Sequence, residues 1–388
     1  MLVDMNSFFA SVEQQANPFL RGRPMGVAAS LHETSCLIAT SKEAKAMGIK
    51  TATSIYKAKK IYPGIVVVKN EPEKYREVSR QINTIFSDYT DQVEPYSIDE
   101  SFLDLTSSKT NPVMVGMEIK RRIREEAGEW LTCSVGIGPN KFIAKLAADY
   151  QKPDGLSVLW ASQLREVYGG KKLSDLWGIS RGWTKRLAGL GIFTPRQLMD
   201  YPLANLMAMF GKPGYYLWQK VNGLDEDIIA TEEDVSKSFG NSWVLNFRTM
   251  DKNLLAPVVL RLAEKAARRM RREGFVSSGV YISVRLADGG GFQQFRKLKF
   301  KINTGLELYI QAMSLWQSWK FSSPVMHIAV GFTSLSPKMN QTSLWPKQED
   351  NLTPVLDKIN DKYGEMMIRP GSLTRTSDYA PDSIAFGK

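Results

Sequence analysis

Three carboxylates, Asp4, Asp99 and Glu100, are the side chains in this sequence whose types and spacing could carry out chemistry. A few carboxylates together with substrate phosphates are the usual protein ligands of Mg²⁺. Two such ions about 4 Å apart can activate an attacking hydroxyl group and stabilise a leaving group. Spacing alone does not distinguish such a site from a solvated Asp-Glu pair, so both interpretations stay open at this point.

Short predicted strands carry or adjoin these carboxylates. Asp4 lies inside the first strand, and the Asp99-Glu100 pair comes directly before the second. The strands are apolar or alternate in polarity: residues 2–5, 101–105 and 133–137. Helical patterns separate them: residues 73–91, 112–130 and 140–150. Strands that leave and return through helices predict a sheet with helices packed on it, so the carboxylates could converge at one end of that sheet.

The remaining sequence changes character twice. Residues 173–225 are predicted to form short helices with repeated glycines, and residues 226–240 are acidic and then rich in Ser, Lys and Gly, as in a linker. The last part begins with a helix at residues 253–273. Two strands follow, residues 280–286 and 295–302, joined by a glycine turn at residues 289–291. The tail is loop-like and contains one further helix at residues 355–363. We therefore expect more than one domain among the 388 residues.

The overall composition limits the class of protein. A net charge of +11 favours an anionic partner, with nucleic acid ahead of a membrane surface, although a merely basic protein stays open on charge alone. Two cysteines, Cys36 and Cys133, and two histidines, His32 and His327, exclude a disulfide framework and the usual zinc clusters. This cysteine usage predicts a cytoplasmic protein, and any metal is expected to bind oxygen ligands.

Three stretches, in the order in which the family has them, resemble the motifs of Y-family translesion DNA polymerases. Val3–Glu13 is similar to the opening motif, Tyr96–Asp104 to the second catalytic motif, and Ser134–Asp149 to the third, which continues to Lys152–Gly155. The resemblance covers essentially the whole chain and is greatest to the bacterial DNA polymerase IV and UmuC groups.

This resemblance implies an α+β, multidomain, right-hand polymerase fold. The implied palm is ferredoxin-like and comprises residues 1–17 and 65–165, with small fingers at residues 18–64. A helical thumb with a helix-hairpin-helix is expected at residues 166–232. An α/β little finger that binds DNA follows at residues 233–336, and a C-terminal tail at residues 337–388.

The resemblance also assigns the catalytic metal ligands. Asp4, Asp99 and Glu100 would hold two Mg²⁺ ions, with the backbone carbonyl of Met5 as a further ligand. Only three residues precede Asp4, so we expect either a strand with little support or a start that lies further upstream.

Contacts to the incoming nucleotide follow from the same resemblance. Phe9 stands where the family keeps a steric gate against the ribose 2′-hydroxyl group, with an ordinary core aromatic as the alternative. Phe8 is expected to face the other way, because adjacent strand residues point to opposite faces. Lys45 and Lys152 are the expected triphosphate ligands. Lys42 and Lys45 replace the Tyr and Arg of many relatives, and Lys45 offers a point charge instead of a bidentate fork.

Two regions are expected to grip DNA. A stretch with Gly178, Ser180 and Gly191 resembles a helix-hairpin-helix, in which backbone N–H groups contact a phosphate. Residues 261–301 carry eleven Lys and Arg against three acids, a net charge of +8. The second strand there alternates basic and apolar residues: Lys297, Lys299 and Lys301 with Leu298, Phe300 and Ile302. We predict one buried face and one row of ammonium groups about 6.6 Å apart, with a solvated sheet face as the alternative.

The tail contains Gln341-Thr342-Ser343-Leu344-Trp345, which looks like the bacterial sliding-clamp binding pentapeptide. Such a peptide would bury Leu344 and Trp345 in a groove while Gln341 makes polar contacts. Sliding clamp, primer-template DNA and deoxynucleoside triphosphates are therefore the expected partners, with an accessory subunit if the chain is UmuC-like.

The sequence thus predicts an error-prone, template-directed DNA polymerase that acts in DNA damage tolerance. The alternatives are a catalytically inactive scaffold that binds DNA and clamp, and a basic DNA-binding module without enzymatic activity. Lesion specificity, fidelity and the choice between the polymerase IV and UmuC groups do not follow from the sequence.

Overall fold

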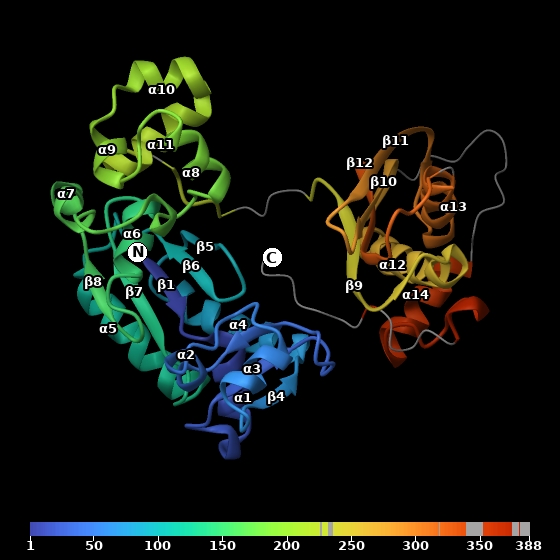
Figure 1. Cartoon of the computed structure of the whole chain (residues 1–388). Coiled ribbons are helices and arrows are strands. Elements are labelled where there is room, and N and C mark those ends of the chain that lie inside the picture. Colours follow the sequence, from blue (N-terminus) through green and yellow to red (C-terminus); the bar gives the residue numbers. More distant parts are fainter. Residues whose placement is uncertain (226, 232–235, 318, 339–351, 375–379, 381–388) are drawn as a thin grey trace. The chain divides into compact units, whose positions relative to one another are not determined.

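The computed structural model describes residues 1–225, 227–231, 236–317, 319–338, 352–374 and 380, and Figure 1 shows the course of the chain. The chain divides near residue 233 into two compact units, in agreement with the linker expected there. Within the described ranges, every helix is too short or too polar to cross a membrane.

A five-stranded sheet forms the centre of the first unit (Figure 1). Its order is β5-β6-β1-β7-β8, which are Val93–Pro95, Glu100–Leu103, Leu2–Met5, Cys133–Ile137 and Leu156–Val158. The central strand β1 pairs antiparallel with β6 and β7, and all four of its residues are buried. A strand covered on both faces is expected to be apolar throughout, so Asp4 is the exception in β1.

Helices cover both faces of this sheet. They are α1 (Phe8–Ala16), α4 (Pro72–Ser87), α5 (Pro112–Arg122, continued by a π-helical turn to Ala127) and α6 (Lys141–Ala148). Val3 and Met5 pack in one core with residues of α1, α4 and α5, whereas Leu2 packs with Ala144 and Ala148 of α6. Because strand residues alternate between faces, Asp4 points to the same face as Leu2, towards α6.

Gly136 lets α6 lie very close to β7. A Cβ atom on Gly136 would lie 2.0 Å from the carbonyl oxygen of Ala144 and 2.3 Å from the backbone nitrogen of Ala148. Both atoms belong to the helix backbone, so neither can move aside as a flexible side chain could. The missing side chain at Gly136 therefore sets the distance between α6 and the strands that carry Asp4 and Glu100.

A second, three-stranded sheet lies in the region expected to form the fingers. Its order is β3-β2-β4, which are Leu37–Thr40, Met25–Ala28 and Val66–Lys69, with α2 (Lys42–Ala46) and α3 (Ile55–Ile61) between β3 and β4 in the chain. The sheet extends past residue 64, because β4 pairs in parallel with β2. The domain limits themselves stay a prediction.

The rest of the first unit is helical. Its helices are α7 (Leu164–Val167), α8 (Arg181–Ala188), α9 (Pro195–Asp200), α10 (Leu203–Phe210) and α11 (Lys212–Asn222). Short 3₁₀ turns occur at Pro18–Leu20, Ala161–Gln163 and Leu173–Asp175. The apolar residues of these helices share a core with Phe142, Ile143 and Leu146 of α6, so one helix contacts both the central strands and the helical part.

The second unit is an antiparallel four-stranded sheet with helices. Its order is β11-β10-β12-β9, which are Gly291–Ile302, Phe275–Leu286, Val325–Pro337 and Phe239–Thr249. The helices are α12 (Lys252–Arg272), α13 (Gly305–Trp316) and α14 (Leu352–Tyr363), followed by a 3₁₀ turn at Gly371–Leu373. The apolar faces of α12 and α13 share one core with the sheet, and β11 is an edge strand.

The predicted alternation along β11 is wrong at one position. Leu298 and Ile302 are buried, but Phe300 is 50% exposed. The pairing explains this, because Ser277 and Gly279 of β10 are separated by one residue, while their partners Ile302 and Lys297 are separated by four. This bulge breaks the strict two-residue period. Lys297, Lys299 and Lys301 are all exposed, as expected.

Replacing Gly136 with alanine tests the close packing of α6. Gly136→Ala is expected to destabilise the protein by at least about 1–3 kcal/mol, because the added methyl group overlaps helix backbone. Gly182→Ala in α8 is the matched control, since its Cβ would meet only Ser180 Oγ at 3.6 Å. That change should be neutral or stabilising by up to about 1 kcal/mol. Urea unfolding followed by circular dichroism gives both values, and equal midpoints for the two variants would contradict the packing.

Candidate active site

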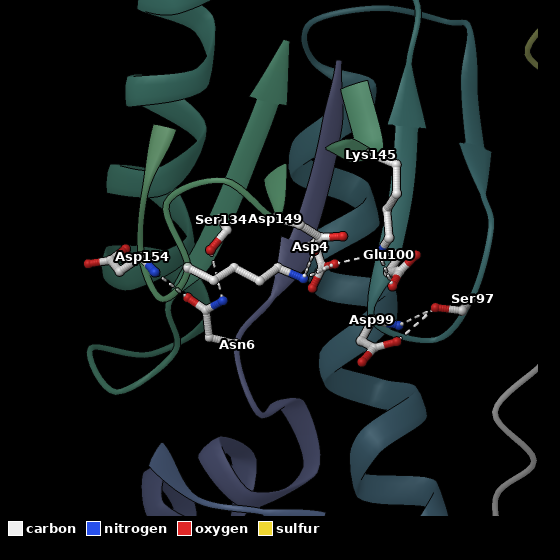
Figure 2. Close-up of polar contacts among 10 residues, drawn as sticks. Asp4, Asn6, Ser97, Asp99, Glu100, Ser134, Lys145, Asp149 and Asp154 are labelled. Carbon is white, nitrogen blue, oxygen red and sulfur yellow. Dashed lines mark hydrogen bonds and ion pairs between the residues drawn. The ribbon is translucent and has the colours of Figure 1, made fainter. Parts of the chain in front are cut away.

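Asp4 and Glu100 lie side by side at the centre of the first unit. They are register partners on β1 and β6, and Asp4 is only 5% exposed. The Lys145 ammonium group from α6 donates to both, at 2.8 Å from Asp4 Oδ2 and 2.6 Å from Glu100 Oε1 (Figure 2). Two of the three predicted carboxylates are therefore joined by a cation that the sequence did not single out.

Asp99 belongs to the same site but has different contacts. Its Oδ1 accepts a hydrogen bond of 2.7 Å from the Ser97 hydroxyl group (Figure 2). Its carbonyl oxygen accepts from the backbone N–H of Met5 at 2.9 Å, which holds the turn before β6 against the end of β1. All three carboxylates and Met5 line one cavity of about 690 Å³.

Lys152 is the second cation on Asp4. Its Nζ lies 2.6 Å from Asp4 Oδ2 and 2.7 Å from Asp149 Oδ1, and it lines the cavity. Its side chain is 34% exposed, against 13% for Lys145. The residue expected to bind triphosphate is therefore at the site, where it is paired with a predicted metal ligand.

Charge and burial together shift the protonation of these groups. Burial acts to raise the pKa of Asp4, but the ammonium groups of Lys145 and Lys152 lower it below its ordinary value. Burial, followed by the negative charge of Asp4, raises the pKa of Glu100. Burial and then Asp4 also raise the pKa of Asp99, against the hydrogen bond from Ser97. Burial acts to lower the pKa of Lys145, but Asp4 and Glu100 raise it, so this lysine stays charged.

Asn6 ties the segment after β1 to the loop after α6. Its Nδ2 donates to Ser134 Oγ at 3.0 Å, and its Oδ1 accepts from the backbone N–H of Asp154 at 2.7 Å (Figure 2). Lys120 and Arg124 form ion pairs with the Asp154 side chain from α5 and the turn that follows it. Since Asp154 is two residues after Lys152, this network fixes the backbone from which Lys152 reaches Asp4.

The aromatic pair Phe8-Phe9 forms one wall of the cavity. The expectation that these residues alternate as in a strand is wrong, because β1 ends at Met5 and α1 begins at Phe8. Both rings are buried and both line the cavity. The Phe9 ring stacks on Tyr75 of α4 at a centroid distance of 4.6 Å, and the Tyr75 hydroxyl donates to Glu13 at 2.6 Å. Phe9 is therefore held in place by a ring that is itself anchored.

Lys42 and Lys45 bring further positive charge to the cavity from α2. The Lys42 ammonium group lies 4.9 Å from the centroid of the Trp130 ring, a cation–π contact. Burial and then the charge of Lys152 lower the pKa of Lys45. Within the described part of the chain neither lysine forms an ion pair, in contrast to Lys145 and Lys152.

The donors at this site fit a hard cation in type. Asp4, Asp99 and Glu100 offer only oxygen, as Mg²⁺ prefers. Among the described residues, no three His, Cys, Asp or Glu side chains are close enough together to hold a metal ion as they stand. The cause is visible in Figure 2, where Lys145 occupies the space between Asp4 and Glu100 while Asp99 turns towards Ser97.

The residues expected to contact DNA in the first unit form a capped turn. Gly178 and Gly191 have φ values of +84° and +77°, which favour glycine, and Ser180 caps α8 by accepting from the backbone N–H of Trp183. Another helix, α9, begins after the turn at Gly191 and is capped by Thr194. The three residues thus lie at helix ends, as the helix-hairpin-helix prediction requires.

The second unit offers less free positive charge than the sequence suggests. Asp357 of α14 accepts two hydrogen bonds from Arg271, at 2.7 and 2.8 Å, and Asp361 pairs with Arg268 and Arg272. On the two strands of the 261–301 segment, the exposed cations Arg285, Lys297, Lys299 and Lys301 have no acidic partner among the described residues. The clamp-like peptide at 341–345 lies outside the described residues.

Lys145 is the site residue that sequence reasoning passed over. It lies inside the third motif, between Ala144 and Leu146, where a charged residue interrupts an otherwise apolar helical stretch. A lysine in such a place needs a buried acidic partner, and this signal could have identified it. The acidic partners themselves come from strands more than forty residues earlier in the sequence.

Comparison with known proteins identifies the family of this chain. Residues 3–149 match the model of the impB/mucB/samB family, and residues 236–344 match the C-terminal domain of the same family. DNA polymerase IV 1 of Bacillus subtilis is 32% identical over 397 residues, which cover all of this chain and 95% of that protein. DNA polymerase IV of Moorella thermoacetica is 35% identical, covering 96% of each chain. A solved structure, a Y-family DNA polymerase chimera of Dbh and Dpo4, superposes with a TM-score of 0.75 at 25% identity, covering 86% of this chain and 97% of that one.

Proposed function

Because the chain belongs to the impB/mucB/samB family of Y-family polymerases, we propose that its central cavity is the site of template-directed DNA synthesis. The protein is a DNA-directed DNA polymerase of the translesion type. The observation that supports the site is the convergence of Asp4, Asp99 and Glu100 on one cavity that also contains Phe9 and three lysines. No observation favours the alternative of an inactive scaffold.

Polymerases of this kind depend on divalent metal ions. Asp4, Asp99, Glu100 and the Met5 carbonyl would hold two Mg²⁺ ions. Ions bound there would activate the primer 3′-hydroxyl group and neutralise the leaving pyrophosphate. The protein itself contributes the fixed positions of these oxygens, since Asp4 and Glu100 are set by strand register and Asp99 by Ser97 and Met5.

We assign the nucleotide to the Phe9 side of the cavity. Lys45, which has no acidic partner in the described part of the chain, would bind the triphosphate from the fingers. Lys152 would bind it from the palm after exchanging Asp4 for a phosphate oxygen. Phe9, held by Tyr75, would exclude a 2′-hydroxyl group by steric overlap, and Phe8 would complete the wall beneath the sugar.

Primer extension tests the catalytic proposal. With Mg²⁺ and four deoxynucleotides, Asp99→Asn is expected to reduce the extension rate by at least about 100-fold, because a ligand is removed from the charge-neutralising site. Asp104→Asn is the matched control, since Asp104 bonds the Thr106 N–H beyond the other end of β6. Wild-type protein that fails to extend a primer, or an Asp99→Asn variant as active as the control, would contradict the proposal.

Sugar discrimination tests the role of Phe9. Phe9→Ala should lower the ratio of kcat/KM for a deoxynucleotide over that for its ribonucleotide by at least about tenfold, because the ring no longer overlaps the 2′-hydroxyl group. The measurement is single-nucleotide incorporation with both sugars on the same primer-template. An unchanged ratio, with deoxynucleotide incorporation retained, would show that another residue excludes ribose.

DNA contact in the second unit is proposed to use the exposed cations of β11 and β10. Lys297, Lys299 and Lys301 would contact backbone phosphates, which gives affinity without sequence preference. The capped turn of Gly178, Ser180 and Gly191 would contact a phosphate through backbone N–H groups.

The salt dependence of DNA binding tests the lysines. Lys299→Gln should lower the slope of log K against log salt concentration by about 0.9, as for one lost phosphate contact on duplex DNA. Lys358→Gln removes the same charge from α14 and should leave the slope unchanged. Fluorescence anisotropy with a labelled primer-template gives both slopes, and equal slopes would exclude Lys299 from the interface.

Three further expectations stay predictions. A sliding clamp is proposed to bind Gln341, Leu344 and Trp345. An accessory subunit would be needed only if the chain behaves like UmuC. The cytoplasmic location expected from the sequence follows the location of the DNA substrate.

A further inference from the structure

Lys145 has the contacts of a built-in counter-ion. Its ammonium group bonds Asp4 and Glu100 at 2.8 and 2.6 Å, and its side chain is 13% exposed (Figure 2). The helix that carries it lies against β7 through the missing side chain of Gly136. The ammonium group is thus presented to both carboxylates by a tightly packed helix, whereas Lys152 reaches Asp4 from a loop and shares itself with Asp149.

We propose that Lys145 is a positioning residue for the polymerase reaction: a permanent cation that holds Asp4 and Glu100 together and weakens their own affinity for divalent metal ions. This inference rests on the proposed function, in which the same carboxylates are metal ligands. Lys145 itself contacts no reacting atom in this proposal.

The physical basis is a competition between cations for the same oxygens. Asp4 and Glu100 would repel each other at this separation, and burial strengthens that repulsion because the surroundings screen it poorly. A fixed ammonium group cancels one of the two charges. The attraction of the pair for a second cation falls by a comparable amount, because the three groups together carry one net negative charge where the two carboxylates alone carry two.

A functional consequence follows for the order of binding. Carboxylates balanced in this way hold a divalent cation weakly by themselves. They hold it tightly only when the triphosphate adds its own oxygens and negative charges. Lys145 therefore makes metal occupancy depend on the nucleotide, so that the fully charged site is assembled only with substrate present.

Binding of Mn²⁺ to the full chain, without DNA or nucleotide, measures the effect by isothermal calorimetry. Lys145→Met is expected to bind Mn²⁺ on the order of tenfold more tightly than the wild type, because the competing charge is gone. Lys145→Gln, which keeps a hydrogen-bond donor without the charge, should behave in the same way and serves if the Met variant does not fold. Lys145→Arg keeps the charge and should retain the wild-type affinity.

Lys141→Met is the matched control. Lys141 lies four residues earlier on α6, is 7% exposed, and pairs with Glu94 at 2.5 Å instead of with the site. Removing it should lower the thermal midpoint equally with and without Mn²⁺ and leave Mn²⁺ affinity unchanged. The Lys145→Met variant, in contrast, should have a lower thermal midpoint than the wild type without divalent ions. Mn²⁺ should restore most of the difference, since ligand binding stabilises the folded state.

A folded Lys145→Met or Lys145→Gln variant that binds Mn²⁺ no more tightly than the wild type would overturn the inference. Asp4→Asn separates this outcome from failure of the proposed function. If Asp4→Asn leaves Mn²⁺ affinity of the Lys145 variants unchanged, the carboxylates are not the metal site and the proposed function fails. If Asp4→Asn abolishes that binding while Lys145→Met has no effect, only the counter-ion role is wrong.

Discussion

The balance of charge around one buried carboxylate underlies the rest of this structure. Asp4 lies in the middle of the central strand, where both faces of the sheet are covered. Burying an unpaired carboxylate in such a place would cost several kcal/mol of folding free energy, or the group would take up a proton and become neutral. The protein meets this cost with two lysines that converge on a single oxygen, Asp4 Oδ2, one from α6 and one from the loop beyond it. Each lysine requires its own support: close helix packing at Gly136 for Lys145, and the Asn6–Asp154 contacts for Lys152.

Two sets of cations in the described part of the chain differ in their surroundings. Lys145, Lys152, Arg268, Arg271 and Arg272 are paired with acids inside their own unit, so their charge holds parts of the protein together. Lys42, Lys45, Arg285 and the three lysines of β11 have no acidic partner among the described residues, and most of them are the cations that we propose for phosphate contacts. The net charge of the sequence does not distinguish the two sets, because the acids that pair with the arginines of α12 belong to α14, about ninety residues further along the chain. The cations that we propose for contact with DNA and nucleotide thus lie on β10, on the edge strand β11 and on the wall of the cavity.

The cavity proposed as the active site combines side chains fixed by their neighbours with long lysine side chains. Strand register fixes Asp4 opposite Glu100, and the ring of Phe9 is fixed by Tyr75, whose hydroxyl group is bonded to buried Glu13. Lys152 and Lys45 reach the cavity on long unbranched side chains, from the loop after α6 and from α2, and we propose that they follow the triphosphate during binding and release.

The sequence by itself indicated the family and the three candidate carboxylates. It also predicted five of the observed strands, β1, β6, β7, β10 and β11, and the helices α4, α5, α6, α12 and α14. Strand β7 was predicted with its observed ends, and the helices α6 and α12 to within two residues at each end, because local hydrophobic periods and caps set these elements. Only the tertiary structure decided which side chains contact one another. The alternation expected at Phe8 and Phe9 was wrong because a helix begins at Phe8. Phe300 is exposed because a bulge in the pairing of β11 with β10 breaks the two-residue alternation of faces. Lys145 could not be assigned from its neighbours in sequence, since Asp4 and Glu100 reach it only when three strands and one helix pack together. Periodicity is a local property of the chain, whereas the charge that a buried lysine meets is set by residues distant in sequence.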